Sequence, residues 1–282
     1  MRIDNHCHVF RVDGLEPPPA LAEAAYVSPK ADLHDYRRHL AEMGCTHGVL
    51  VQPSSYGTDD HRMLLGALAS DPTHLRGVAC APVASSDETL AEMDAAGVVA
   101  TRVQDGYPGG VPVTKIEEVA QRVRHLGWHI EVWSDIRQHL PWFTKVVSDL
   151  GVDIVIDHLG YVPSNARLDS PEMRALIELL TLKNVWITLS GSERLMPQEA
   201  NPRDVRAVAN HEAAITDRVQ AFIDAAPDRV LWGSDWPHVG LTKAPTSVEI
   251  LSRWERWVPN PATRLRIVRD NNARRYGFPP PA

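Results

Sequence analysis

The sequence predicts a single-domain (β/α)8 barrel, also called a TIM barrel, and two observations predict it. Eight short apolar runs, most of them rich in Val and Ile, recur along the 282 residues, and the stretches between them have helical spacing. A barrel of eight strand–helix units takes about 250 residues, which matches one domain of this length. The expected strands are 2–4, 48–52, 77–81, 98–103, 129–133, 154–157, 186–189 and 230–233.

An open doubly wound sheet is the competing fold. That fold usually carries a glycine-rich turn between a strand and a helix, and the sequence has neither a G-x-G-x-x-G nor a G-x-x-x-x-G-K-[ST] motif. The expected helices have clear apolar faces, and the longest helical segment begins near Val205. One apolar stripe consists of Leu33, Tyr36, Leu40 and Met43, and the glycines expected to end helices are Gly44, Gly97, Gly127 and Gly151.

We expect residues 1–282 to form one domain without an internal linker. The segment 11–30, which follows the first strand, contains three consecutive prolines and is too long for a passive connection. We therefore expect it to form a lid or a wall of a pocket. The last residues, 279–282, are expected to form a loose tail.

Composition and charge exclude several classes of protein. The chain is 44% hydrophobic with 8 Trp, which excludes a disordered protein. A net charge of −7 without a long basic run argues against nucleic-acid and membrane partners. The three cysteines have no C-x-x-C spacing, so we expect no disulfide scaffold or structural zinc site. The sequence shows neither a membrane-spanning run nor a signal peptide, so we expect a cytoplasmic protein; a homo-oligomer remains open.

Ionisable residues gather where the predicted strands end, which is where barrel enzymes carry out their chemistry. His6 and His8 lie two residues apart at the end of the first strand, so their side chains should point the same way. A less specific interpretation is that Asp4 and Asp157 only cap loops or orient a histidine. The candidates at the later strand ends are Arg102, His158, Arg194, Asp235 and His238.

The chain also carries six distinctive segments in order: DNHCHVF, VQPSSYGTDD, IDHLG, SGSERL, VLWGSDWPH and DNNARRYGF. Together they resemble the amidohydrolase superfamily, and within it the branch of 2-pyrone-4,6-dicarboxylate lactonases. This resemblance covers nearly the whole chain and implies a barrel that hydrolyses a small lactone, often an anionic one from the breakdown of aromatic compounds.

The resemblance also implies roles for single residues. Asp235 matches the general base of the family, which takes a proton from the attacking water. Ser54 matches a residue near the substrate. The residues that match the catalytic histidines are His6, His8 and His158, and those that match substrate-carboxylate ligands are Arg102 and Arg194.

Two departures from the family pattern bear on the substrate. Tyr161 stands where the lactonases have an arginine, and the loop 105–110 lacks a second one. Because arginine binds carboxylates through two hydrogen bonds, these losses favour a lactone with one acidic group, or a muconolactone-like compound, over a dicarboxylate. The other side chains expected to line the pocket are Tyr56, Trp133 and His238.

The ligand set predicts that no metal ion is required. The strand around Arg102 lacks the Lys or Glu that bridges two metals, and the only histidine of the next strand, His129, lies at its start. One Zn²⁺ is the alternative, with ligands drawn from His6, His8, His158 and Asp235.

Three other functions compete with the lactonase. The first is a zinc-dependent decarboxylase of an aromatic acid on the same barrel, and the second is a lactonase of sugar acids. The third is a barrel that only binds an acidic ligand, but such a protein would be expected to have lost Asp235 or a histidine, and it has not. A serine esterase is disfavoured because the sequence has no G-x-S-x-G motif.

Overall fold

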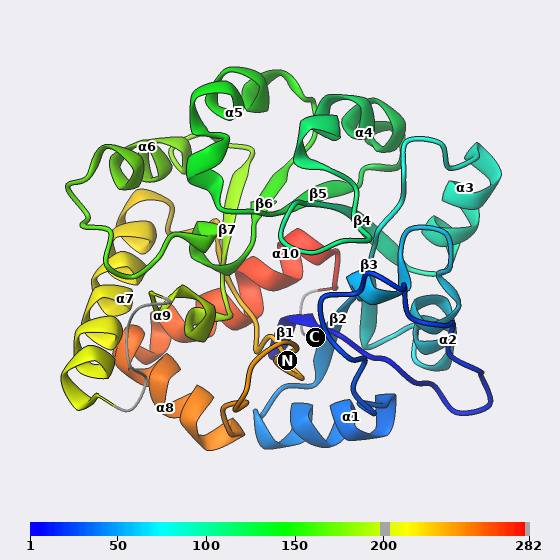
Figure 1. The fold of residues 1–282 in the computed structure, drawn as a ribbon, viewed down its shortest axis with the longest axis horizontal. Helices are drawn as coiled ribbons and strands as arrows, with labels where there is room; N and C mark the ends of the chain where they lie inside the picture. The colour runs from blue at the N-terminus through cyan, green and yellow to red at the C-terminus, as the bar shows by residue number, and fades with distance from the viewer. Residues whose placement is uncertain (198–203, 280–282) are drawn as a thin grey trace.

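The computed structural model describes residues 1–197 and 204–279 and confirms the predicted barrel. Eight parallel strands pair in sequence order, and a bridge between Cys7 and Trp236 joins the end of the last strand to the first (Figure 1). All eight expected runs are strands. They are β1 (Ile3–Cys7), β2 (His47–Val51), β3 (Leu75–Ala79), β4 (Val98–Gln104), β5 (His129–Trp133), β6 (Ile154–Ile156), β7 (Val185–Leu189) and β8 (Val230–Trp232).

Helices surround the strands, and local sequence sets their ends. The side chain at the N-cap of five helices accepts a hydrogen bond from the backbone N–H three residues on, and these caps are Asp32, Ser86, Ser170, Thr246 and Asn260. The helices are α1 (Leu33–Glu42), α2 (Arg62–Ser70), α3 (Asp87–Ala95), α4 (Ile116–Val123), α5 (Leu140–Val146), α6 (Pro171–Leu179), α7 (Val205–Ala225), α8 (Ser247–Trp257), α9 (Pro261–Leu265) and α10 (Asn272–Tyr276).

The predicted helix faces are largely those that pack on the barrel. The stripe on α1 is buried, and the four glycines expected to end helices all have positive φ. Val205, however, is 81% exposed, because the first turns of α7 extend beyond the core and its buried apolar face begins only at Ile215.

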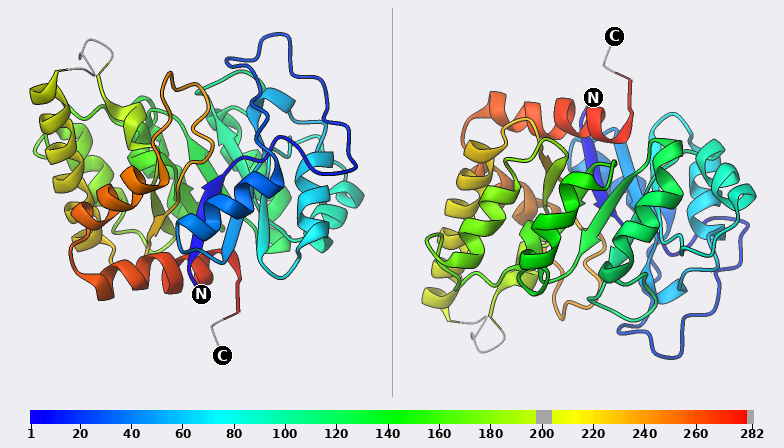
Figure 2. Two further views of the ribbon diagram at one scale, coloured as in Figure 1. Left: turned by 90° about the horizontal axis from the view of Figure 1, so that it is seen from below. Right: turned by 90° about the horizontal axis from the view of Figure 1, so that it is seen from above.

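The two ends of the barrel carry different parts of the chain. The N-terminus, α9 and α10 lie at one end, and the loops that follow the strands lie at the other (Figure 2). From α10, the Asn272 side chain donates to the carbonyls of Ile3 and Trp232, which closes the barrel at the first end. The opposite end is left for a site. Among the described residues, no helix is long and apolar enough to cross a bilayer.

The segment 11–30 lies against the turn that follows β2. The backbone N–H of Leu21 donates to the Ser55 carbonyl (2.8 Å), and the hydroxyls of Ser28 and Ser55 are 3.0 Å apart. Figure 2 shows this segment at the loop end of the barrel. Its action as a lid or pocket wall stays a prediction. Of the expected tail, Pro279 is exposed, and 280–282 lie outside the described residues.

Candidate active site

A bulge in β1 brings neighbouring residues into the barrel. Between Asp4 and Cys7, which are both paired with β2, the strand has one residue more than its partner. Asn5 donates a hydrogen bond inside the barrel, to the hydroxyl of Thr188. The next residue, His6, is fully buried and reaches the mouth. The bulge therefore places the Asn5 amide inside the barrel, next to the His6 imidazole of the candidate site.

The side chains of three histidines lie close together at the mouth of the barrel. The ring centroid of His6 is 5.2 Å from that of His8 and 4.7 Å from that of His158. The Nδ1 of His8 donates to the Val51 carbonyl (2.8 Å), so a neutral His8 has no hydrogen on Nε2. The Nδ1 of His158 lies 2.8 Å from the Ser190 hydroxyl, whereas neither ring nitrogen of His6 has a hydrogen-bond partner among the described residues.

Asp235 follows β8 in the left-handed region of the backbone map, with φ of 65°. Its N–H donates to the His6 carbonyl (2.9 Å), which fixes the turn against β1. Its Oδ2 accepts a hydrogen bond from Arg194 Nε (2.9 Å). Its Oδ1 lies 4.0 Å from His158 Nε2 and has no hydrogen-bond partner in the described part of the chain. One carboxylate oxygen is thus available to accept a proton.

Arg102 and Asp157 form a second buried ion pair. The Nη2 of Arg102 is 3.1 Å from Asp157 Oδ2, and its guanidinium carbon lies 5.0 Å from the centre of the Trp133 ring. The other oxygen of Asp157 is 3.7 Å from His6 Nδ1. Asp157 therefore pairs with Arg102 and faces His6. The sequence analysis considered that Asp157 caps a loop or orients a histidine, but not that it pairs with Arg102.

Burial sets the charge of the imidazoles. Removal from water lowers the pKa of His8 to about 4 and that of His158 to about 3. Burial, with help from His158, also holds the pKa of His6 well below its usual value. All three rings are therefore neutral near pH 7, and each can donate at most one hydrogen bond.

The two carboxyl groups of the site differ in charge. Burial opposes ionisation of Asp235, but Arg194 and the neighbouring imidazoles together hold its pKa below the usual value. For Asp157, burial outweighs Arg102 and raises the pKa to about 7. Asp235 is therefore the carboxylate that is fully ionised at neutral pH.

Comparison with known proteins decides the family. Residues 3–278 match the model of the amidohydrolase family. The chain belongs to this family. A 2-pyrone-4,6-dicarboxylate hydrolase of Comamonas testosteroni is 30% identical over 97% of this chain and 89% of its own length. A 4-sulfomuconolactone hydrolase of Hydrogenophaga intermedia is 26% identical over 97% and 88%, respectively.

Solved structures share the fold of this amidohydrolase. A Pseudomonas putida structure assigned to 2-pyrone-4,6-dicarboxylic acid hydrolase is 30% identical, has a TM-score of 0.81, and is matched over 98% of this chain and 97% of that chain. A Burkholderia multivorans amidohydrolase crystallised with bound zinc is 22% identical, with a TM-score of 0.76 over 99% of this chain and 100% of that chain.

Two overlapping groups of side chains in this amidohydrolase could hold a metal ion. The first is His6, His8 and Asp235, and the second is His6, Asp157 and His158; within each group the ligand atoms lie within 4.8 Å of one another. The ring nitrogens of His6 without hydrogen-bond partners and the unprotonated Nε2 of neutral His8 suit a metal. Because both groups need His6, the donor set fits one ion.

Aromatic side chains form one wall of the mouth. The Trp133 ring centre lies 5.9 Å from that of Tyr161 and 6.2 Å from that of His158. The ring centre of a third aromatic residue, Tyr107, lies 4.7 Å from that of Trp133. The structure thus places Trp133 and Tyr161 on the side of the mouth that contacts His158, and their role in binding substrate stays a prediction.

Ser54 and Tyr56 lie in a short 3-10 helix after β2. Both are buried, and the Tyr56 hydroxyl donates to the Phe10 carbonyl (2.9 Å). That hydrogen bond attaches the Tyr56 side chain to the segment that follows β1. No side-chain hydrogen bond of Ser54 to the imidazoles is found among the described residues.

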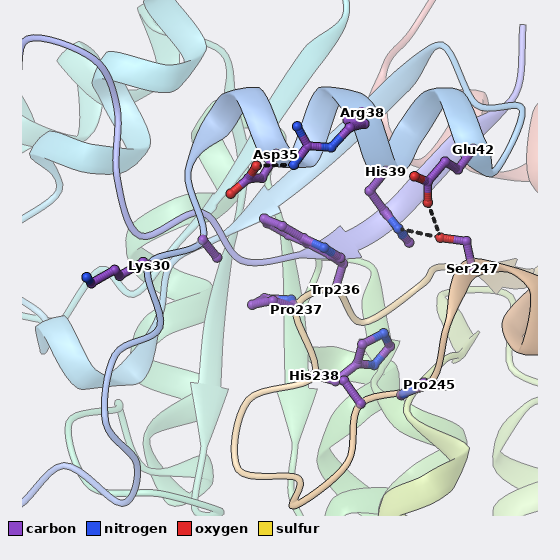
Figure 3. A pocket seen from close by; sticks show the side chains of 12 residues that line it. Lys30, Asp35, Arg38, His39, Glu42, Trp236, Pro237, His238, Pro245 and Ser247 are labelled. Carbon is purple, nitrogen blue, oxygen red and sulfur yellow. Dashed lines mark hydrogen bonds and ion pairs between the residues drawn. The ribbon is translucent and has the colours of Figure 1, made fainter.

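His238 follows Asp235 closely in the loop after β8 and also lines a separate cavity of about 370 Å³. Its N–H donates to the Asp235 carbonyl, and neither ring nitrogen has a partner in the described chain. Figure 3 shows the cavity, with His238 below Trp236 and Pro237 and His39 on α1 above them. His238 is therefore a neighbour of Asp235 that also borders a second space.

Three residues of the site were missed or undervalued from the sequence. Asp157 stands next to His158 in the sequence, and this D-H pair was a usable signal for a site residue. Ser190, which supports His158, gives no sequence signal. Tyr107 lies in a loop rich in Gly and Pro, and only the three-dimensional structure shows that its ring reaches the mouth.

Proposed function

We propose that this amidohydrolase hydrolyses a small lactone that carries one acidic group, with Asp235 as the general base. The observation that carries the proposal is the buried, ionised carboxylate of Asp235, which has one free oxygen beside three neutral imidazoles. The names of the relatives support a lactone as substrate.

Ring opening begins with a water molecule. The free Oδ1 of Asp235 takes a proton from this water while the oxygen attacks the lactone carbonyl. The carbon–oxygen bond of the ring then breaks, and the proton on Asp235 passes to the departing ring oxygen. The new carboxylic acid then releases the second proton of the water to solvent. The products are the carboxylate and hydroxyl of an open-chain acid and one free proton, and one water is consumed.

Polarisation of the carbonyl falls to His6 and His158. A neutral His8 spends its only N–H on the Val51 carbonyl and cannot donate to the substrate. His6 has no partner that fixes its hydrogen, and the Ser190 hydroxyl can accept from or donate to His158. Either ring can therefore present an N–H to the oxygen that becomes negative, which is the function of an oxyanion hole.

One bound ion is the alternative source of polarisation. His6, His8 and Asp235, or His6, Asp157 and His158, would hold it. Such an ion would polarise the carbonyl and lower the pKa of a bound water to about 7. We propose that the imidazoles suffice without it, so the requirement for a metal becomes part of the test.

Charge pairing limits the substrate. Arg102 is matched by Asp157 and Arg194 by Asp235, and the imidazoles are neutral. Burial raises the pKa of Asp157 to about 7, so protonation of Asp157 would leave at most one arginine charge, that of Arg102, unbalanced at the mouth. This supports a lactone with one acidic group, bound by Arg102 and Arg194, rather than a dicarboxylate.

A panel of lactones, followed by proton release, tests the proposal. The panel contains neutral, monoanionic and dianionic members, and each is assayed before and after dialysis against a strong chelator, with elemental analysis of both samples. We expect a monoanionic lactone to be the best substrate, at most one zinc per chain, and activity that survives dialysis. Release of CO₂ from an aromatic acid, without lactone turnover, would instead establish the decarboxylase. Activity lost on dialysis and restored by Zn²⁺ would move His6, His8 and Asp235 from direct catalysis to ligation.

A further inference from the structure

The loop 105–111 after β4 folds back onto its own strand. Gln104 N–H donates to the Val111 carbonyl (2.7 Å), and Val103 and Val111 form an isolated parallel bridge. The loop is thus anchored at both ends, with Tyr107 near its tip.

One buried side chain holds the backbone of Tyr107. The Nε2 of Gln104 donates to the Tyr107 carbonyl (2.7 Å), and the Oε1 of Gln104 accepts from the Tyr107 N–H (2.9 Å). Gln104 is only 2% exposed, so these hydrogen bonds are shielded from water. Both backbone polar groups of Tyr107 are therefore fixed by one amide.

Glycines seat the loop closely on the mouth. A Cβ at Gly106 would lie 2.5 Å from the Trp133 ring, and a Cβ at Gly109 would lie 2.3 Å from the Ser54 carbonyl oxygen. Neither position has room for a larger residue. The loop is therefore fitted against the aromatic wall and the turn after β2.

The Tyr107 side chain reaches across the mouth to the loop after β8. Its hydroxyl oxygen lies 2.8 Å from the position of a Cβ at Gly240. The residue before Gly240, Val239, accepts a hydrogen bond from Arg194 Nη1 (2.9 Å). The Tyr107 hydroxyl therefore stands against the loop segment that holds the arginine expected to bind substrate.

Arg194 cannot offer its whole guanidinium to an acidic group. Two of its five N–H donors are engaged, because Nε donates to Asp235 and Nη1 donates to the Val239 carbonyl. A carboxylate therefore cannot use the two-pronged contact that includes Nε, and it meets only the remaining N–H groups of Nη1 and Nη2. A hydroxyl donor beside these groups would help to fix its orientation.

The geometry points to Tyr107 as a specificity-determining residue: its hydroxyl donates to the acidic group that Arg194 binds, and its ring, with Trp133, forms the wall along which the lactone ring lies. Gln104 is the positioning residue that holds Tyr107 in this place. This inference rests on the proposed lactone hydrolysis, and it adds to it a residue that neither motif nor spacing indicated.

Tyr107→Phe tests the hydroxyl, because it removes one oxygen and keeps the ring. The assay uses a monoanionic lactone and, as internal control, the analogue that lacks the acidic group. A hydrogen bond to a charged group predicts a rise in KM of roughly tenfold or more for the anionic lactone, with kcat changed less than about twofold and the neutral analogue unaffected. Equal changes for both substrates, or no change for either, would overturn the inference.

Gln104→Leu tests the positioning role. Without the amide, the Tyr107 backbone is released, and we expect KM for the anionic lactone to rise while kcat for the neutral analogue stays. Tyr107→Phe combined with Gln104→Leu should then be no worse than Gln104→Leu alone; additive losses would show that Gln104 acts elsewhere. If the wild-type enzyme hydrolyses no lactone, the proposed function and this inference both fail; if it does and Tyr107→Phe behaves as wild type, only the inference fails.

Discussion

Single residues at the mouth are arranged in opposite-charge pairs, and the pairs explain how buried charges are tolerated. A buried ion without a partner is strongly destabilising, whereas the Arg102–Asp157 and Arg194–Asp235 pairs have contacts of 3.1 and 2.9 Å. Each arginine therefore has two tasks, to neutralise a carboxylate and to attract an anionic substrate.

Arg102→Met and Arg194→Met should each separate these tasks. We expect a loss of about 10- to 100-fold in kcat/KM for an anionic lactone, since a charge-assisted hydrogen bond contributes roughly 1.5–3 kcal/mol. Arg102→Met should hydrolyse a neutral lactone at nearly the wild-type rate. Arg194→Met should also lose some activity on the neutral lactone, because it removes the cation that keeps Asp235 ionised, but the loss should be larger on the anionic one. Comparison of kcat/KM for the two substrates is the measurement, and equal losses on both would show that the arginines are structural.

The sequence indicated which residues meet at the mouth but not how they pair. Spacing of two placed His6 and His8 on the same side of a strand, and strand order brought His158 and Asp235 to them. The contact of Arg194 with Asp235 joins the loops after β7 and β8, and the reach of Tyr107 to Gly240 joins the loop after β4 to the loop after β8. Contacts between loops depend on backbone paths that periodicity does not encode.

Among the elements, the end of β8 approaches β1 very closely, at a seam that contains Gly233. A Cβ at Gly233 would lie 2.3 Å from Asn5 Oδ1 and 2.7 Å from the His6 backbone nitrogen. The strands can approach this closely only because Gly233 has no side chain. The bulge in β1 lies at the same seam, so the position of His6 depends on both features.

Gly233→Ala should therefore destabilise the fold and disturb the site. Overpacking predicts a loss of about 1–3 kcal/mol in the free energy of unfolding. Gly66→Ala is the matched control, because there the nearest atom belongs to the partly exposed, flexible side chain of Leu15, and alanine is favoured within helix α2. Urea denaturation of both variants is the measurement. Equal stability of the two would contradict the claim that β8 and β1 approach too closely for a side chain at Gly233.

Element types were predictable from the sequence, whereas loop conformations were not. Buried parallel strands form continuous apolar runs in the sequence, so all eight were found. The end of β1 at Cys7 was not predicted, because Asn5 and His6 are polar although they are buried. Val205 was grouped with the apolar residues of α7 but is exposed, because the helix extends past the barrel at its start.

The whole molecule buries many histidines in neutral form. Burial, chiefly, lowers the pKa of nine histidines in the described chain, whereas three carboxyl groups, Asp4, Glu131 and Asp157, have pKa values raised by burial. When the chain unfolds below about pH 6.5, the nine histidines take up protons. The three carboxyl groups release protons, but a smaller number. The unfolded chain therefore binds more protons in this range.

Stability should accordingly fall as the pH falls. A lowered histidine pKa stabilises the folded state above about pH 6.5, and this stabilisation is lost toward the folded pKa, which is about 4 for His8 and about 3 for His158. We expect metal-free protein to have a clearly smaller free energy of unfolding at pH 5 than at pH 7, by urea denaturation. A stability that is constant or higher at pH 5 would show that the carboxyl groups dominate.

Asp235→Asn tests the central claim most directly. The amide keeps the shape of the side chain and can still contact Arg194, but it cannot take a proton from water. With the best lactone of the panel, and with circular dichroism showing an intact fold, we expect kcat to fall by about 10²- to 10⁴-fold. An Asp235→Asn enzyme that opens the same lactone at nearly the wild-type rate would contradict the assignment of Asp235 as the general base.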